Sequence, residues 1–203
     1  MSDISADQVK RLRDLTGAGM MDCKRALQET GGDVDKAIEL LREKGLASAA
    51  KRAGRAANQG LIDSYIHFNN TVGVLIEVNS ETDFVANTDE FKQLVKDIAL
   101  HIASPAAPQW LAREDVPNQV VEQEEHIARV QAKESGKSDN VIDRIVEGKL
   151  RAFYEDSVLL EQPFVKDDSK TIQLLLDEVG AKVGEKVAVR RFVRYKLGES
   201  TEG

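Results

Sequence analysis

The side chains that most often perform chemistry are few in this sequence, and they lie far apart. There is one cysteine, Cys23, and there are three histidines, His67, His101 and His126. A lone cysteine allows neither a disulfide within the chain nor a cysteine-cluster zinc site. No nucleophile stands next to an evident base, and no acid is paired with a base at a useful spacing. The sequence therefore predicts no enzyme, no metal site and no cofactor.

Two glycine-containing motifs are weak candidates for phosphate binding. Gly17-Ala18-Gly19 is shorter than the dinucleotide-binding fingerprint and follows a predicted helix, not a strand. Gly136-Lys137-Ser138 resembles the end of a Walker A motif, but the first glycine of that motif is missing and the flanks are helical. We expect neither to bind a nucleotide. Cys23 falls on the apolar face of its predicted helix, which favours a buried, unreactive thiol.

One polar segment, residues 79–87, surrounds an aromatic residue and stands out from the rest of the chain. It follows the end of a strand pattern and precedes a helix pattern, so Phe84 lies on a connection. Two interpretations are open. In the first, Thr82 or Asp83 caps a turn and Phe84 folds back onto the end of the sheet. In the second, Phe84 projects as an aromatic anchor for a partner, with the Asp83 carboxylate beside it.

The overall charge argues against tight binding to nucleic acid. The 203 residues include 28 Lys and Arg against 35 Asp and Glu, which gives a formal charge of -7. Nucleic-acid binders usually carry a basic field that displaces counterions from phosphates. We therefore expect no direct nucleic-acid partner, although a local basic patch stays open.

Hydropathy predicts a soluble protein of a reducing cytosol. The N-terminus shows neither a basic segment followed by an apolar run nor an Arg-rich leader. No stretch approaches the roughly 20 apolar residues that span a bilayer. We expect a cytoplasmic protein with no membrane partner, and its hydrophobic fraction of 41% can support a packed core.

The first 45 residues have the periodicity of three short helices. Ser5 and Gln8 have the form of a capping box, and Ile4 and Val9 that of a hydrophobic staple. The predicted helices run from Ser5 to Leu15, from about Met20 to Gly31, and from Asp33 to Gly45. Their inward-facing residues are Val9, Leu12, Leu15, Met20, Cys23, Ala26, Leu27, Val34, Ala37, Ile38 and Leu41. Residues 1–45 resemble a ubiquitin-associated-type domain, a small docking module.

Residues 46–60 are rich in Ala, Ser, Gly and basic residues, which is typical of a linker that is partly helical at most. Lys51, Arg52 and Arg55 lie here. A solvated linker is the simpler interpretation of these charges, and contact with RNA is the alternative.

Beyond Gly60 the pattern predicts an α+β fold. Alternation over residues 62–68 and 72–78, separated by Asn69-Asn70, predicts an antiparallel hairpin. Residues 187–197 predict a third strand of the same sheet, in which Val187, Val189, Val193 and Tyr195 share one face. Amphipathic helices are expected from Thr88 to before Pro105 and again after Pro163, with no other strand. Between them, residues 117–162 predict two helices in an antiparallel hairpin with narrow apolar seams. The expected seam residues are Val120, Val121, Ile127, Val130, Val141, Ile142, Ile145, Val146, Leu150 and Phe153.

Several motifs resemble those of the elongation factor Ts family. Residues 16–24 read TGAGMMDCK, and residues 82–85 are Thr82, Asp83, Phe84 and Val85. Residues 147–149 and 162–165 are similar to further landmarks of the family. The motifs occur in the family's order between residues 9 and 197, which covers nearly the whole chain.

The resemblance implies a role in translation elongation and protein biosynthesis. Family members bind elongation factor Tu in its GDP-bound and nucleotide-free forms and promote GDP release without making or breaking a bond. It implies that Met20 and Met21 lie in the contact between the N-terminal domain and the partner, with Met21 the better candidate for exposure. It further implies that Thr82, Asp83, Phe84 and Val85 form the partner-binding segment. Within it, Phe84 wedges between partner helices while Asp83 disturbs the magnesium site.

One departure from the family concerns the core domain. Many members carry two copies of the strand-strand-helix unit, and this sequence has one, within expected core segments 61–116 and 163–203. A single short sheet leaves an edge to cover, so we expect a homodimer in which a second chain supplies the missing half. Two rival functions stay open, namely an adaptor for ubiquitin-like or nascent chains and an RNA-binding translation protein.

Overall fold

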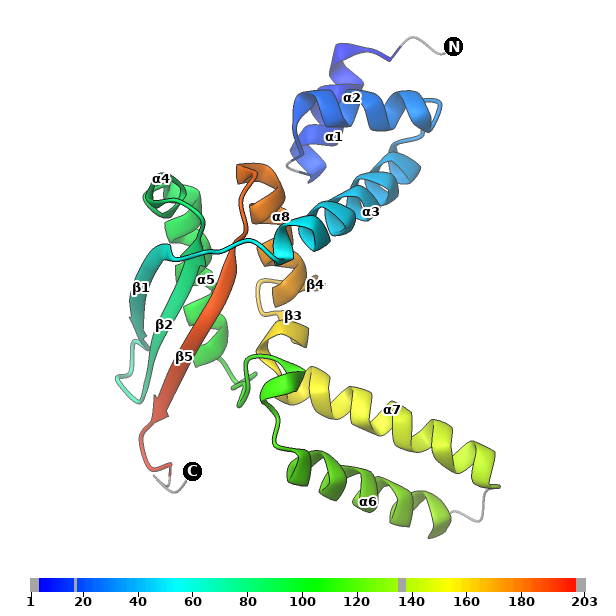
Figure 1. Cartoon of the computed structure of the whole chain (residues 1–203), viewed down its shortest axis with the longest axis vertical. Helices are drawn as coiled ribbons and strands as arrows, with labels where there is room; N and C mark the ends of the chain where they lie inside the picture. The colour runs from blue at the N-terminus through cyan, green and yellow to red at the C-terminus, as the bar shows by residue number, and fades with distance from the viewer. Residues whose placement is uncertain (1–3, 17, 135–137, 200–203) are drawn as a thin grey trace. The chain divides into compact units, whose positions relative to one another are not determined.

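The computed structural model describes residues 4–16, 18–134 and 138–199, and it has the expected α+β fold (Figure 1). Two compact units make up the chain. The first comprises residues 1–61, 78–92 and 174–188, and the second comprises residues 62–77, 93–173 and 189–203. Among the described residues, no helix combines the length and the apolar character needed to cross a membrane.

Three helices form the N-terminal bundle: α1 (Ala6–Thr16), α2 (Met20–Glu29) and α3 (Val34–Ala53). The predicted capping box is confirmed. The Gln8 backbone N–H donates to Ser5 Oγ at 3.2 Å, and the Ser5 N–H donates to Gln8 Oε1 at 3.0 Å. Asp33 caps α3 by accepting from the Lys36 N–H at 3.1 Å.

The bundle has a small core of its own, made of Val9, Leu12, Cys23, Ala26, Leu27 and Ala37. Two predictions for this core are wrong, because Leu15 and Met20 are 60% and 46% exposed. Both lie beside the connection between α1 and α2, at helix ends that leave the bundle core. Cys23 is fully buried as predicted, and burial raises the pKa of its thiol.

The predicted end of the third helix at Gly45 is also wrong. Helix α3 continues through Gly45 to Ala53 and ends at Gly54. A glycine inside a helix costs only about 1 kcal/mol relative to alanine, and it ends the helix only where the backbone turns. The part of the expected linker from residue 46 to residue 53 is therefore helical.

A three-stranded sheet has the order β1-β2-β5, from β1 (Gln59–Ile66), β2 (Val72–Ser80) and β5 (Ala188–Lys196). Neighbouring strands run antiparallel (Figure 1). The predicted turn between β1 and β2 is confirmed, with Asn70 at a φ of +57°. Val74, Ile76 and Val78 share the buried face of β2, as their alternation predicts.

Strand β5 departs from the predicted alternation at Arg190 and Arg191, which are both exposed. Val189 before this point is buried, while Val193 and Tyr195 after it are 39% and 70% exposed. Two consecutive exposed residues break the alternation of period two, and residues 191, 193 and 195 beyond this point are all exposed. The C-terminal half of β5 therefore exposes its valine and tyrosine.

Helices α5 (Asp89–Ala103) and α8 (Ile172–Val183) occupy the predicted positions. The predicted stripe of α5 is buried at Phe91, Leu94, Val95, Ile98 and Ile102. The expectation of no further strand is wrong, because β3 (Pro163–Phe164) and β4 (Asp167–Thr171) form a small antiparallel pair. Strand β3 has only two residues and β4 is polar, so neither shows the apolar alternation that predicts a strand.

Helices α6 (Asn118–Glu134) and α7 (Asp139–Ser157) form the predicted helical hairpin, and residues 135–137 between them lie outside the described residues. The turn motif Gly136-Lys137 therefore has no structural description. The seam is built from Ala128, Ala132, Ile142 and Val146. The predicted seam residues Ile127, Val130 and Val141 are about 40% exposed, because two alanines bring the helices into contact along a different stripe.

His101 on α5 is fully buried at the centre of a hydrogen-bond network. The Val165 backbone N–H donates to its Nδ1 at 3.2 Å, so the ring proton lies on Nε2, which donates to Gln162 Oε1 at 2.9 Å. The Gln162 amide donates in turn to the carbonyls of Ala106 and Asp156. The neutral imidazole satisfies every partner, and burial lowers the pKa of His101.

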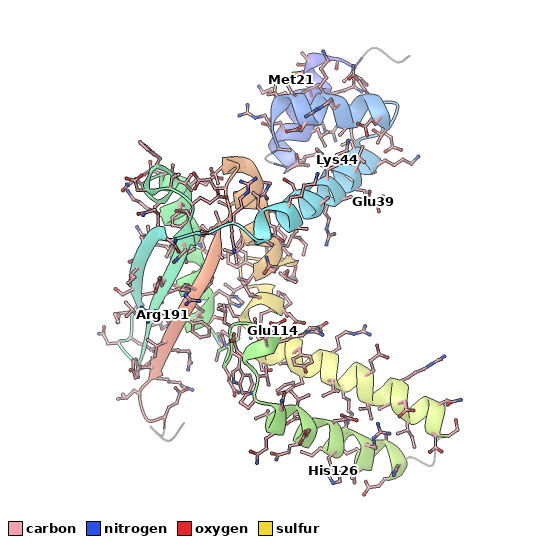
Figure 2. All side chains as sticks on the ribbon, viewed as in Figure 1. Met21, Glu39, Lys44, Glu114, His126 and Arg191 are labelled. Atoms are coloured by element: carbon pink, nitrogen blue, oxygen red, sulfur yellow. The ribbon has the colours of Figure 1, made fainter. Side chains whose placement is uncertain are left out.

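This network predicts a loss of stability in mild acid. The unfolded chain binds a proton near pH 6.5 and the folded chain at lower pH, so the free energy of unfolding falls as the pH drops from 7.5 to 5.5. One histidine contributes at most about 1.4 kcal/mol per pH unit. Urea unfolding across this range measures the slope. We expect a flatter slope for His101→Gln. His126→Gln, whose exposed side chain lies on α6 (Figure 2), is the matched control for loss of an imidazole outside this network. An unchanged slope in His101→Gln would contradict this assignment.

Candidate functional site

Phe84 lies on a one-turn helix, α4 (Asp83–Ala86), and is 82% exposed. The interpretation in which it folds back onto the sheet is therefore wrong for this residue. Thr82 is the N-cap of α4, where its Oγ1 accepts from the Val85 N–H at 3.5 Å. The capping half of that interpretation is correct, and the aromatic ring nevertheless projects into solvent.

The first and second halves of α4 have opposite surroundings. Val85 and Ala86 are 9% and 5% exposed, so they anchor the turn in the protein interior. Asp83 is exposed beside Phe84, and its carboxylate has no hydrogen bond or ion pair with the described part of the chain. The structure thus offers Asp83 and Phe84 together, while Thr82 and Val85 support them from behind.

The carboxylate of Glu185 braces the segment that leads into α4. It accepts from the backbone N–H groups of Glu81 and Thr82 at 3.1 and 3.0 Å. It also accepts from the Thr82 hydroxyl at 2.6 Å. A carboxylate with several donors is a strong and geometrically defined acceptor, because bonds to a charged group are shorter and stronger than neutral ones.

Glu81 in turn accepts a hydrogen bond from the segment that carries Glu185. Its Oε1 accepts from the Lys186 backbone N–H at 2.6 Å and from the Arg55 guanidinium at 3.2 Å. The hydrogen bond from the Lys186 N–H lowers the pKa of Glu81. Residues 81–82 and 185–186 therefore hold each other through two carboxylates, which we call the carboxylate brace.

The turn after α8 is shaped to present Glu185. Gly184 has a φ of +76°, the left-handed conformation in which helices commonly end. At Gly180 a Cβ atom would lie 2.8 Å from the Glu185 carbonyl oxygen, so the turn packs against helix backbone that has no room for a side chain. Lys186 Nζ donates to the carbonyls of Ala53 and Arg55, which ties the turn to the end of α3.

The two methionines of the N-terminal motif are both exposed. Met21 is 65% exposed on the first turn of α2 (Figure 2). Met20 beside it is 46% exposed, and Leu15 is 60% exposed at the end of α1. The expectation of exposure for Met21 is confirmed. The three residues give the bundle an apolar surface near the α1–α2 connection, of which Gly17 lies outside the described residues.

Two of the three basic residues of the expected linker take part in structure. Arg52 is 6% exposed and donates to Ser48 Oγ, and Arg55 pairs with Glu81. Further along, Arg191 pairs with Glu77. Lys51 is exposed. The contacts of Arg52 and Arg55 within the fold leave less of an open basic patch for RNA.

The second unit has an exposed apolar face on the sheet, which the sequence analysis did not identify as a surface. Ile62 and Ile66 on β1, Leu75 on β2, and Val193 and Tyr195 on β5 are between 39% and 70% exposed. Ile62, Leu75 and Val193 line a hollow of about 330 Å³ on this face. Alternation in β1 predicts a shared face for Ile62 and Ile66, but nothing in it says whether that face is covered.

The comparisons with known proteins agree on one family. The family model described as elongation factor TS matches residues 4–199. A protein named elongation factor Ts from Coprothermobacter proteolyticus is 61% identical over 97% of this chain and 100% of its own length. Relatives of the same name from Thermoanaerobacter sp. (strain X514) and Geobacter metallireducens are 58% and 57% identical, over 98% and 97% of this chain and 97% and 90% of theirs. Because the family model covers residues 4–199 and full-length relatives are 57–61% identical, the chain belongs to the elongation factor Ts family.

Proposed function

We propose that this protein is a guanine-nucleotide exchange factor for elongation factor Tu and that it acts by inserting Asp83 and Phe84 near the partner's magnesium and phosphate site. Family membership supports the partner and the reaction. The observation that carries the mechanism is the 82% exposure of Phe84 on a turn whose next residue, Val85, is buried. Such a protein works in the cytoplasm, where elongation takes place.

The mechanism needs no chemical step by this chain. GDP is held in its partner by Mg²⁺ and by backbone amides that surround the phosphates. A protein that binds the nucleotide-free partner more tightly than the GDP-bound partner weakens GDP binding by the same factor. Phe84 displaces partner side chains, and the Asp83 carboxylate competes for hydrogen bonds around the magnesium ion.

The size of the effect follows from the area of the aromatic ring. Burial of a phenylalanine removes about 150–250 Å² from water. Full burial of such a side chain is worth about 1.5–3 kcal/mol. Because that energy is gained only when the partner's nucleotide site has opened, it appears in the rate of GDP release.

The N-terminal bundle supplies the second contact in this proposal. Met20 and Met21 are exposed on the first turn of α2, and methionine adapts its shape to irregular apolar surfaces. Contact through these residues docks the bundle on the nucleotide domain of elongation factor Tu, and so keeps the Asp83-Phe84 turn near its target.

Substitution of Phe84 tests the wedge. We expect Phe84→Ala to slow the release of a fluorescent GDP analogue from elongation factor Tu between about 10-fold and 100-fold, which corresponds to the apolar burial lost. We expect Asp83→Ala to slow it less, through the magnesium site alone. The stability of both variants should stay unchanged, because both side chains are exposed.

Ile127→Ala is the matched control for an exposed apolar side chain, since Ile127 lies 39% exposed on α6. It should release GDP at the rate of the intact protein. If the intact protein binds elongation factor Tu but leaves GDP release unchanged, the exchange-factor proposal is wrong.

We further propose that two chains form a homodimer through the exposed face of the sheet. The apolar residues of this face lie on all three strands of one sheet. Exposed apolar surfaces of this kind usually mark an interface, and a two-fold axis lets one such surface cover another copy of itself. The second copy would supply the core contacts that a single strand-strand-helix unit lacks.

Sedimentation measures this directly. At micromolar concentration we expect the mass of two 22.4 kDa chains. Leu75→Lys should give a folded monomer, because Leu75 is 48% exposed and a buried unpaired lysine disfavours the interface. Val130→Lys, on the exposed side of α6, should remain dimeric. A monomeric mass for the intact protein would rule out the dimer.

A further inference from the structure

We propose that Glu185 is a positioning residue for nucleotide exchange, which holds the segment before α4 so that Asp83 and Phe84 are presented to the partner. This inference rests on the proposed function of the Asp83-Phe84 turn. Glu185 itself points at the backbone of residues 81 and 82, so it acts through them and not by touching the partner.

The first step of the argument concerns the orientation of the Thr82 hydroxyl. An ionised carboxylate can only accept hydrogen bonds, so at 2.6 Å the hydroxyl proton must point toward Glu185 Oε1. The lone pairs of Thr82 Oγ1 then face the Val85 N–H, which donates to it at 3.5 Å. Glu185 therefore sets the direction in which Thr82 caps α4.

The second step concerns the shortness of α4. A helix of four residues has few internal hydrogen bonds, here from the Ala86 N–H to the Thr82 carbonyl and from the Asn87 N–H to the Asp83 carbonyl, and helix formation is unfavourable until several turns exist. External bonds must therefore stabilise the turn. Glu185 occupies both backbone N–H groups just before Asp83, and Val85 provides the buried anchor on the other side.

The third step concerns rigidity. Glu81 accepts from the Lys186 N–H, so movement of either segment breaks bonds in both directions. The absence of a side chain at Gly180 lets the turn of Glu185 pack directly against helix α8. A group held on two sides loses little conformational entropy on binding. Preorganisation of this kind lowers the cost of binding, so more of the contact free energy appears as affinity.

The decisive experiment is GDP release from elongation factor Tu at increasing concentrations of the factor. We expect Glu185→Ala to lower the saturating rate about tenfold, since a small misplacement of an inserted group has large kinetic effects. The half-saturating concentration should change little, because the exposed methionines on α2 are untouched. Glu185→Gln keeps the side-chain shape and one acceptor oxygen. Its saturating rate should therefore fall between those of the intact protein and Glu185→Ala.

Glu90→Ala is the matched control. Glu90 pairs with Lys182 at 2.5 Å, so it also joins the start of α5 to α8, but it makes no bond to residues 81 or 82. It should release GDP at the rate of the intact protein. Amide hydrogen exchange supplies a readout that does not depend on activity. Protection should fall at the Glu81, Thr82 and Val85 amides in Glu185→Ala, and should persist in Glu90→Ala.

A double-mutant cycle separates positioning from general damage. If Glu185 acts through Phe84, adding Glu185→Ala to Phe84→Ala lowers the rate by much less than tenfold. If the double variant shows the product of the two single losses in rate, Glu185 only supports the fold, and the inference is overturned. Equal rates for Glu185→Ala, Glu90→Ala and the intact protein would overturn it as well, with the exchange function intact. No acceleration by the intact protein would overturn both.

Discussion

The hydrogen bonds between residues 81–82 and 185–186 are the constraint on which the candidate site depends. Backbone N–H groups at the start of a short helix need acceptors, and here the Glu185 carboxylate provides them. Once this segment is fixed, the helical turn buries Val85 and leaves Phe84 in solvent. In the turn that follows the brace, one of two adjacent apolar residues, Val85, belongs to the core and the other, Phe84, is exposed.

Exposed apolar side chains occur in several places, which fits a protein whose work is binding. Among them are the turn at Phe84, the bundle surface with Met20 and Met21, the open face of the sheet with Leu75, and the β1–β2 connection with Phe68, which is 86% exposed. Single exposed apolar residues are common, but a whole sheet face and two almost fully exposed phenylalanines are not. The fully buried His101 is neutral and hydrogen-bonded within the fold, which leaves it no role at these surfaces.

Much of the fold could be predicted because its signals are local. The capping pair Ser5 and Gln8 and the alternation that buries Ile76 are both short-range patterns. The errors have physical causes. Gly45 lacks the positive φ that would end a helix, and β3 and β4 have too few apolar residues to show alternation. In the helical hairpin, packing against small side chains selects Ala128 over its apolar neighbour Ile127.

The candidate site shows the same limit more sharply. Local sequence identified the segment around Phe84 but left its direction open, because exposure is decided by contacts made elsewhere. Those contacts come from Glu185, 103 residues away from Thr82, in a turn that matches no motif. Glu185 provides an acceptor for the backbone N–H groups of Glu81 and Thr82. The turn therefore does not need the burial of Phe84 for its stability. The free energy of burying that ring is then not used in folding and can be gained on binding a partner. In this turn, other bonds replace the stabilisation that burial of the aromatic ring would have contributed.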